Sequence, residues 1–246
     1  MTDPVTEPTT ESVTGPGTGS SDDPVALLRQ HRVLAILRDH AGGPHLAATA
    51  DALVDAGIAV LEFTLDTPGA PALIERFAGT SSVVVGAGTV RTPADVDLVA
   101  ASGARFVVSP DLHPPVVERA LALGLAPLPG VATPSEIRQA VDLGAPMVKL
   151  FPAGPLGAAY LRSLRAPFPD VPLVATGGIG PDDVDTFLAA GADAVALGGA
   201  LAHADPEEAG RRAHAVLAQI RAVADADGAH RSSRALDHPP PVDTPT

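Results

Sequence analysis

A single lysine, Lys149, stands in a chain of 246 residues that carries fifteen arginines. It lies inside the apolar run 146–153, which reads PMVKLFPA. Arginine supplies surface charge as well as lysine does, but its guanidinium stays protonated and cannot act as an amine nucleophile. A lone lysine in an apolar run therefore predicts covalent chemistry, in which its amine attacks a carbonyl carbon and forms a Schiff base.

A glutamate in a second apolar run is the natural partner for this lysine. Glu62 lies in residues 59–65 (AVLEFTL), where strand alternation groups it with Val60 and Thr64 on one face. If both runs are strands of one barrel, Glu62 and Lys149 share its interior. Burial lowers the pKa of a lysine and a nearby carboxylate raises it again, so the amine becomes partly neutral. A buried structural ion pair is the alternative interpretation.

The elements that must position these residues recur at regular intervals. Short β-rich apolar runs alternate with segments of helical periodicity, most of which start near a proline and end at a glycine. Eight such units predict an α/β fold, a single-domain (β/α)₈ TIM barrel. A Rossmann-like open sheet is the alternative, but no GxGxxG follows the first run and the units number eight rather than six. The runs are 33–37, 59–65, 83–88, 105–109, 125–130, 147–151, 172–176 and 193–197.

Composition predicts the limits of this barrel domain. Residues 1–23 are rich in Thr, Pro, Ser, Gly and acids, which predicts a disordered N-terminal tail. Residues 24–224 form the predicted barrel domain, and PVALLRQHR at its start predicts an N-terminal helix that caps the barrel floor. Residues 225–246, which end in HPPPVDTPT, are predicted to be a disordered C-terminal tail.

Charge and cysteine content narrow the classes of function. The formal net charge of −13 argues against partners such as nucleic acid or an anionic membrane, because both need clustered Lys and Arg. The absence of cysteine removes disulfides, thiolate catalysis and Cys-ligated metals. No signal peptide or membrane span is predicted, so we expect a cytoplasmic protein. The eight histidines form no HxH or HExxH pattern, so no metal site is expected.

Two glycine pairs follow the last two predicted strands. Gly177 and Gly178 come after the run that ends at Thr176, and Gly198 and Gly199 come after the final run. Paired glycines let backbone N–H groups approach an anion closely, and the loops after the seventh and eighth strands are where barrels commonly bind phosphate. Tight turns also need glycine, so each pair alone is weak support.

These motifs, in this order, resemble a known family of enzymes. LEFTL, VGAGTV, VSPDL, PLPGVATPSE, VKLFPA and ATGGI are similar to motifs of the Schiff-base aldolases for 2-keto-3-deoxy-6-phosphogluconate (KDPG) and 4-hydroxy-2-oxoglutarate (KHG). The similarity extends from Val33 to about Gly210. It implies a homotrimer of barrels without metal or other cofactor, which cleaves a small-molecule 2-oxo acid to pyruvate and an aldehyde.

The resemblance also assigns roles to individual residues. It implies that Lys149 is the Schiff-base lysine and that Glu62 transfers protons. Thr89 and Pro110 would shape the pyruvate pocket, with Phe151 beside it. Thr176 and the backbone of both glycine pairs, Gly177–Gly178 and Gly198–Gly199, would meet the distal part of the substrate.

Two positions depart from the family pattern. Many members carry an arginine four residues after the glutamate, where this chain has Asp66. Arg38, at the end of the first strand, resembles an arginine of the galactonate-pathway branch and would supply the missing cation. Where phosphogluconate aldolases place a serine after the last glycine pair, this chain has Ala200, so a phosphate would lose one hydroxyl donor.

Three functions therefore compete. A pyruvate-producing aldolase must form an imine on Lys149. A catalytically silent barrel that binds an anionic metabolite would form none, and the changes at Asp66 and Ala200 motivate this alternative. A sugar-phosphate epimerase would use the same glycine pairs but would need no lysine nucleophile.

Overall fold

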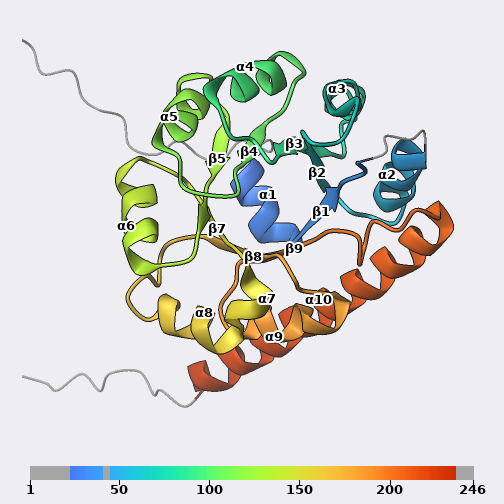
Figure 1. The fold of residues 1–246 in the computed structure, drawn as a ribbon. Helices are drawn as coiled ribbons and strands as arrows, with labels where there is room; N and C mark the ends of the chain where they lie inside the picture. Colours follow the sequence, from blue (N-terminus) through green and yellow to red (C-terminus); the bar gives the residue numbers. More distant parts are fainter. Residues whose placement is uncertain (1–22, 41–44, 237–246) are drawn as a thin grey trace, which may run out of the picture.

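Strands alternate with helices along the chain in the computed structural model, which describes residues 23–40 and 45–236 (Figure 1). The strands are β1 Val33–Leu37, β2 Val60–Thr64, β3 Val84–Gly88, β4 Phe106–Val108, β5 Ala126–Leu128, β6 Gly130–Val131, β7 Val148–Leu150, β8 Leu173–Thr176 and β9 Ala194–Leu197. The helices are α1 Pro24–His31, α2 His45–Asp55, α3 Ala70–Ala78, α4 Pro93–Ala101, α5 Pro114–Ala122, α6 Pro134–Asp142, α7 Ala153–Leu156, α8 Ala158–Arg165, a 3₁₀ turn Pro181–Asp183, α9 Val184–Ala189 and α10 Pro206–Leu236.

The strands form one parallel sheet in the order β5-β4-β3-β2-β1-β9-β8-β7-β6. Its two ends, β5 and β6, are one stretch of chain interrupted at Pro129, which has no N–H to donate. The first half of this stretch pairs with β4 and the second half with β7, and the Pro129 carbonyl accepts a hydrogen bond of 2.9 Å from the Lys149 N–H. The sheet thus closes on itself with eight strand positions, which confirms the predicted (β/α)₈ barrel.

The side chains of each strand alternate between the helix layer and the barrel interior. On β2, Leu61 and Phe63 belong to the apolar cluster under the helices, whereas Val60 belongs to a second, inner cluster. The inner cluster also contains Leu28 of α1, which is fully buried. In Figure 1 this helix lies at the centre of the barrel, and it contacts β2 and β9. The predicted floor-capping helix is therefore confirmed.

The helices begin where the sequence signals predict. α4 and α6 each start at a proline that follows a threonine N-cap, Thr92 or Thr133. In both cases a capping box forms, because the threonine accepts from the backbone N–H of an acid three residues later and that acid accepts from the threonine N–H. These caps fix the starts of the two helices a few residues after the ends of β3 and β6.

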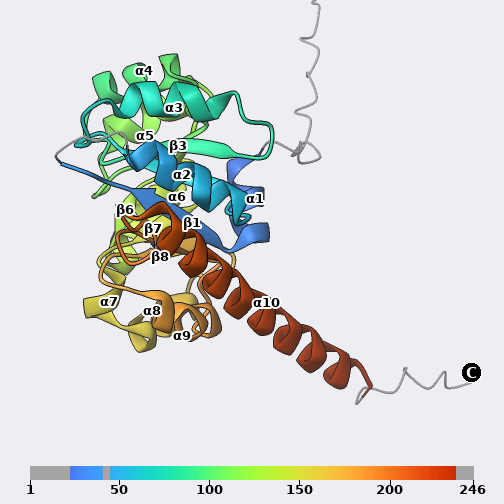
Figure 2. The ribbon, with the colours of Figure 1, turned by 90° about the vertical axis from the view of Figure 1, so that its right-hand side faces the viewer.

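The C-terminal boundary differs from the prediction. We expected an unstructured tail from residue 225, but α10 continues to Leu236 and extends away from the barrel (Figure 2). Alanine and arginine are frequent in this segment, and both have a high intrinsic propensity for helix. Residues 1–22 and 237–246 lie outside the described residues, so the disorder predicted there stays a prediction. No helix within the described ranges is long and apolar enough to cross a membrane.

Candidate active site

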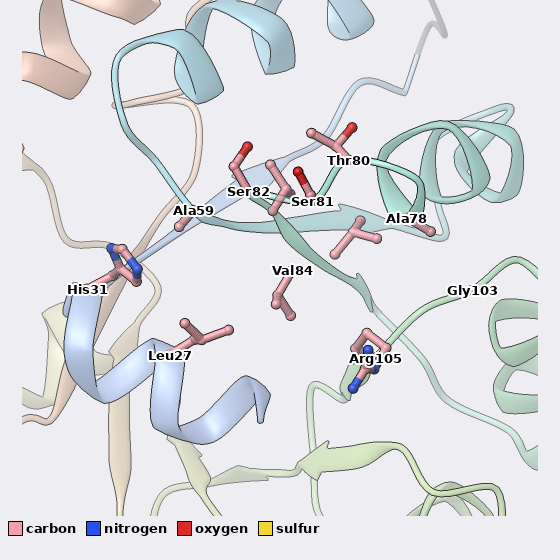
Figure 3. A pocket seen from close by; sticks show the side chains of 12 residues that line it. Leu27, His31, Ala59, Ala78, Thr80, Ser81, Ser82, Val84, Gly103 and Arg105 are labelled. Carbon is pink, nitrogen blue, oxygen red and sulfur yellow. The ribbon is translucent and has the colours of Figure 1, made fainter. Parts of the chain in front are cut away.

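A cavity of about 250 Å³ opens at the carboxyl end of the barrel strands. The predicted site residues that line it are Arg38, Glu62, Lys149, Phe151, Thr176, Gly177, Gly178, Gly198 and Gly199. A larger cavity of about 430 Å³ lies at the opposite end, between α1 and the start of β3 (Figure 3). Leu27, His31, Val84 and Arg105 are among its lining residues, and none of the predicted site residues reaches it. The ionisable groups predicted for chemistry therefore gather in the smaller cavity.

Lys149 is held inside the barrel by its strand. It lies on β7, its side chain is buried, and its Nζ lies 4.7 Å from the centroid of the Phe151 ring. Burial lowers the pKa of Lys149, the Glu62 carboxylate counteracts this effect, and the Arg38 charge adds to it. The net direction favours the neutral amine, which is the nucleophilic form.

Glu62 enters the same cavity from β2 and is 2 % exposed. A Cβ atom on Gly88 of β3 would overlap Glu62 Oε1, so only glycine leaves room for this carboxylate. Glu62 Oε2 is buried without a hydrogen-bond partner. Burial raises the pKa of Glu62, whereas the charges of Lys149 and Arg38 lower it in part. A carboxyl group with a raised pKa and an unpartnered oxygen is suited to taking up and returning a proton.

Arg38 connects the cavity to the ends of two further strands. Its Nη2 donates to Thr89 Oγ1 at 3.0 Å, and its Nε lies 3.3 Å from Thr64 Oγ1 and 3.4 Å from Asp66 Oδ2. Thr89 has a φ of 58°, which is unusual for a β-branched residue. Thr89 thus does not line the cavity itself but helps to hold the guanidinium that does.

The distal wall is built from the two glycine pairs. Gly177 and Gly178 have φ values of 88° and 71°, and a Cβ on Gly177 would lie 2.6 Å from the Phe151 ring. Thr176 donates its hydroxyl to the Ala196 carbonyl at 3.2 Å. The close contact with Phe151 therefore requires glycine at position 177 and joins the distal wall to the aromatic ring beside Lys149.

Some predictions and the structure differ at this site. Pro110 does not line the cavity; a Cβ on Gly130 would overlap its carbonyl, so Pro110 packs against β6. The sequence reasoning missed Ile36 and Ile179, which do line it. Strand alternation from Arg38 pointed to Ile36, while Ile179 directly follows the first glycine pair. Among the described residues, no three His, Asp or Glu side chains are grouped as metal ligands would be.

Comparison with protein families gives an independent result for this chain. The family model described as KDPG and KHG aldolase matches residues 25–214. A 2-dehydro-3-deoxy-6-phosphogalactonate aldolase of Escherichia coli K12 is 32% identical over 199 residues, which cover 79% of this chain and 95% of that protein.

Solved structures resemble the chain over a similar extent. The structure described as native KDPGal has a TM-score of 0.73 and 31% identity, and the match covers 78% of this chain and 96% of that one. A KDPG aldolase from Legionella pneumophila, with pyruvate captured as a covalent carbinolamine, has a TM-score of 0.68 and 28% identity. This match covers 81% of this chain and 97% of that one.

Proposed function

The chain belongs to the KDPG and KHG aldolase family, and we propose that it cleaves a 2-keto-3-deoxy-6-phospho sugar acid to pyruvate and an aldehyde phosphate through a Schiff base on Lys149. The observation that carries this proposal is the shared cavity of Lys149 and Glu62. Burial moves the pKa of the amine down and that of the carboxyl up, so the two pKa values move toward each other and proton transfer at this site becomes easier.

The covalent step belongs to Lys149. Its neutral Nζ attacks the C2 ketone of the 2-oxo acid and forms a carbinolamine, which loses water to give a protonated imine. As the C3–C4 bond breaks, its electron pair forms the C2–C3 double bond and the electron pair of the C=N bond moves onto the nitrogen, so that an enamine of pyruvate remains. Phe151, whose ring lies 4.7 Å from Nζ, offers its face to the cationic nitrogen.

The proton transfers belong to Glu62. Its carboxylate, directly or through a water, takes the C4 hydroxyl proton while the C3–C4 bond breaks and the aldehyde leaves. The same proton is then available for C3 of the enamine, and hydrolysis of the resulting imine frees pyruvate and Lys149. Glu62 Oε2, buried and unpartnered, is the atom that we assign to this exchange.

The remaining cavity residues would hold the two anionic ends of the substrate. Arg38, fixed by Thr89 and Thr64, is the cation for the C1 carboxylate. At the other end, Thr176 and the glycine pairs after β8 and β9 offer backbone N–H groups to a phosphate.

Borohydride trapping with pyruvate tests this function. A wild-type chain incubated with pyruvate and borohydride is expected to gain the mass of one reduced pyruvyl group, mapped by peptide mass spectrometry to Lys149. Because the chain has one lysine, the only other amine is the α-amino terminus, and a sample without pyruvate is the control. Absence of an adduct at saturating pyruvate would replace this proposal with the silent barrel.

Substrate choice needs a separate assay. Pyruvate release, followed with lactate dehydrogenase and NADH, would be compared for the 6-phosphates of 2-keto-3-deoxygluconate and 2-keto-3-deoxygalactonate and for 4-hydroxy-2-oxoglutarate. We expect the two phosphates to be cleaved with the higher kcat/KM, because their anion is carried on C6 and extends toward the distal glycines, whereas the second carboxylate of 4-hydroxy-2-oxoglutarate is attached directly to C4. The homotrimer that the resemblance implies is likewise a proposal, and light scattering should give three times the mass of the chain.

A further inference from the structure

The two glycine pairs of the distal wall are held in different ways. A Cβ on Gly177 or Gly178 would lie within 3.2 Å of neighbouring atoms, so packing fixes the first pair. A Cβ on Gly198 or Gly199 would meet nothing within 4 Å. Glycine has the largest backbone freedom of any residue, so a pair without packing needs another restraint to keep one conformation.

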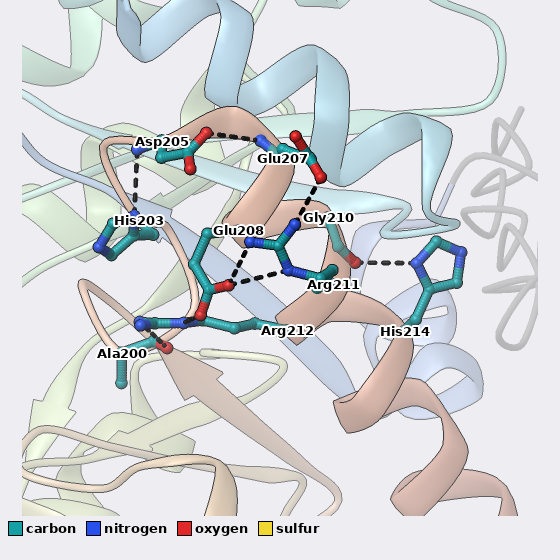
Figure 4. A network of polar contacts seen from close by, with 9 residues as sticks. All are labelled: Ala200, His203, Asp205, Glu207, Glu208, Gly210, Arg211, Arg212 and His214. Carbon is teal, nitrogen blue, oxygen red and sulfur yellow. Dashed lines mark hydrogen bonds and ion pairs between the residues drawn. The ribbon is translucent and has the colours of Figure 1, made fainter.

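That restraint comes from a side chain of α10. Arg212 Nη1 donates to the carbonyl of Ala200 at 3.0 Å (Figure 4). The next N–H, of Leu201, donates to the Gly198 carbonyl at 2.8 Å. The peptide group between Ala200 and Leu201 is thus held at its carbonyl by Arg212 and at its N–H by Gly198, which fixes the turn that Gly199 occupies.

The guanidinium of Arg212 is oriented by an acid on the same helix, Glu208. Its Nε donates to Glu208 Oε1 at 2.7 Å, and its side chain is one-third exposed. Arg211 holds the other oxygen, Glu208 Oε2, at 3.0 and 2.9 Å, and also reaches Glu207 (Figure 4). Within the described residues, the side chain of Arg211 bonds only these two acids, whereas that of Arg212 continues to the loop.

We propose that Arg212 is a positioning residue, which orients the backbone of residues 198–200 toward the distal anionic group of the substrate. Ala200 has no hydroxyl to donate, so recognition at this end depends on peptide N–H groups, whose direction follows the turn that Arg212 fixes. This inference rests on the proposed aldolase function. It assigns to Arg212 the selectivity for a phosphorylated over an unphosphorylated substrate, and no direct contact with either.

A pair of adjacent arginines provides the test. Arg212→Met and Arg211→Met each remove one arginine from the same glutamate, but only the first releases the loop. For Arg212→Met we expect KM for the 6-phosphate substrate to rise roughly tenfold, the effect of losing one charge-assisted hydrogen bond, with kcat little changed. KM for the unphosphorylated sugar acid should stay the same. Arg211→Met should leave both values at the wild-type level.

Two pyruvate-only readouts separate this inference from the proposed function. Borohydride trapping needs Lys149, and exchange of the pyruvate methyl protons in D₂O needs both Lys149 and Glu62. Neither needs a distal group, so Arg212→Met should retain both. Wild-type protein that shows neither would remove the aldolase proposal. Wild-type activity together with equal KM changes in the two arginine variants, or equal losses on both substrates, would overturn the role of Arg212 alone.

A conservative variant provides a second test in case Arg212→Met does not fold. Arg212→Lys keeps the charge, but a single ammonium lacks the planar fork that binds Glu208 and the Ala200 carbonyl together. We expect the same loss of selectivity for the phosphorylated substrate, in smaller measure. Unchanged selectivity in a folded Arg212→Lys protein, with Arg211→Lys as its control, would contradict the fork geometry proposed here.

Discussion

The lower and upper halves of the barrel interior are built from the same strands but from different kinds of side chain. The inward positions run from Val60 to Glu62 on β2, and from Met147, directly before β7, to Lys149 on β7. The lower member of each pair belongs to the inner apolar cluster, which Leu28 of α1 closes from below. The upper member lines the cavity. Two residues along a strand are enough to change a packed floor into a reactive centre.

The difference shows how the floor supports the chemistry above it. A water-excluding layer directly beneath Lys149 and Glu62 removes solvent from one side of both groups. This desolvation is the main cause of the lowered pKa of Lys149 and of the raised pKa of Glu62. The apolar half contributes stability, and the polar half uses the environment that the apolar half creates.

The largest effect should come from Lys149 itself. Lys149→Arg keeps the charge but removes the nucleophilic amine, so kcat for pyruvate release should fall by about 10⁴-fold or more. Circular dichroism should show an intact fold, and borohydride trapping should be lost. Met147→Leu, two residues earlier and in the inner apolar cluster, is the control and should keep full activity, because the swap preserves volume there. Retained turnover in Lys149→Arg would rule out the imine mechanism.

Glu62→Gln should give the second-largest effect on turnover. Loss of the proton-transfer group is expected to lower kcat by about 10²- to 10³-fold while pyruvate trapping persists.

Imine formation needs the neutral amine, so its initial rate should rise with pH through the pKa of Lys149, which burial places below the ordinary value of 10.5. The Glu62 carboxylate raises that pKa, and Glu62→Gln should therefore move the inflection to lower pH. An inflection that moves to higher pH would contradict electrostatic coupling of the two groups.

Period-two alternation explains why the reactive centre could be predicted from sequence. The lone lysine and the glutamate each stand in an apolar run, and a barrel brings the inward positions of different strands together at one end. The structure confirms that Glu62 and Lys149 share one interior. Gly88, which leaves room for Glu62, lies in the VGAGTV motif. The need for glycine at this position follows from the contact with Glu62, which only the structure shows.

Contacts between distant elements could not be predicted in the same way. Thr89 reaches the cavity through Arg38. Arg212, which lies on α10 twelve residues after Ala200, reaches the Ala200 carbonyl. Such contacts depend on where a helix docks and on side-chain rotamers, and neither leaves a periodic trace in the sequence. The length of α10 was missed for a related reason, because its last turns have little apolar patterning to reveal a helix.

The floor should affect stability more than activity. Leu28→Ala removes a fully buried side chain of α1 and should lower the free energy of unfolding by about 3 kcal/mol, measured by urea denaturation. The folded fraction should retain kcat within a few-fold, because Leu28 does not line the cavity. Leu27→Ala, beside it on the same helix but only partly buried, is the matched control and should have the smaller effect on unfolding. A large loss of kcat in folded Leu28→Ala protein would mean that the apolar half of the barrel interior also contributes directly to activity.

The smallest effect is expected at the rim, where Asp66 pairs with Arg38 at 3.4 Å. Asp66→Asn keeps the shape of the side chain and removes a negative charge beside the cation that we assign to the substrate carboxylate. Both partners are partly exposed, so KM should fall only about two- to fivefold, and less at high salt. Asp51→Asn, which breaks the exposed pair with Arg76 away from the cavity, is the control and should not change KM.

Asp66 also reaches the reactive centre through its charge. Burial is the main cause of the raised pKa of Glu62, and the Asp66 carboxylate adds to it. In Asp66→Asn the pKa of Glu62 should therefore fall, and the acid limb of the kcat profile should move to lower pH, because Glu62 must be ionised to accept the C4 hydroxyl proton. A rise in KM with an unmoved acid limb would instead assign Asp66 the task of holding Arg38 in place, and the negative charge would then serve geometry rather than oppose binding.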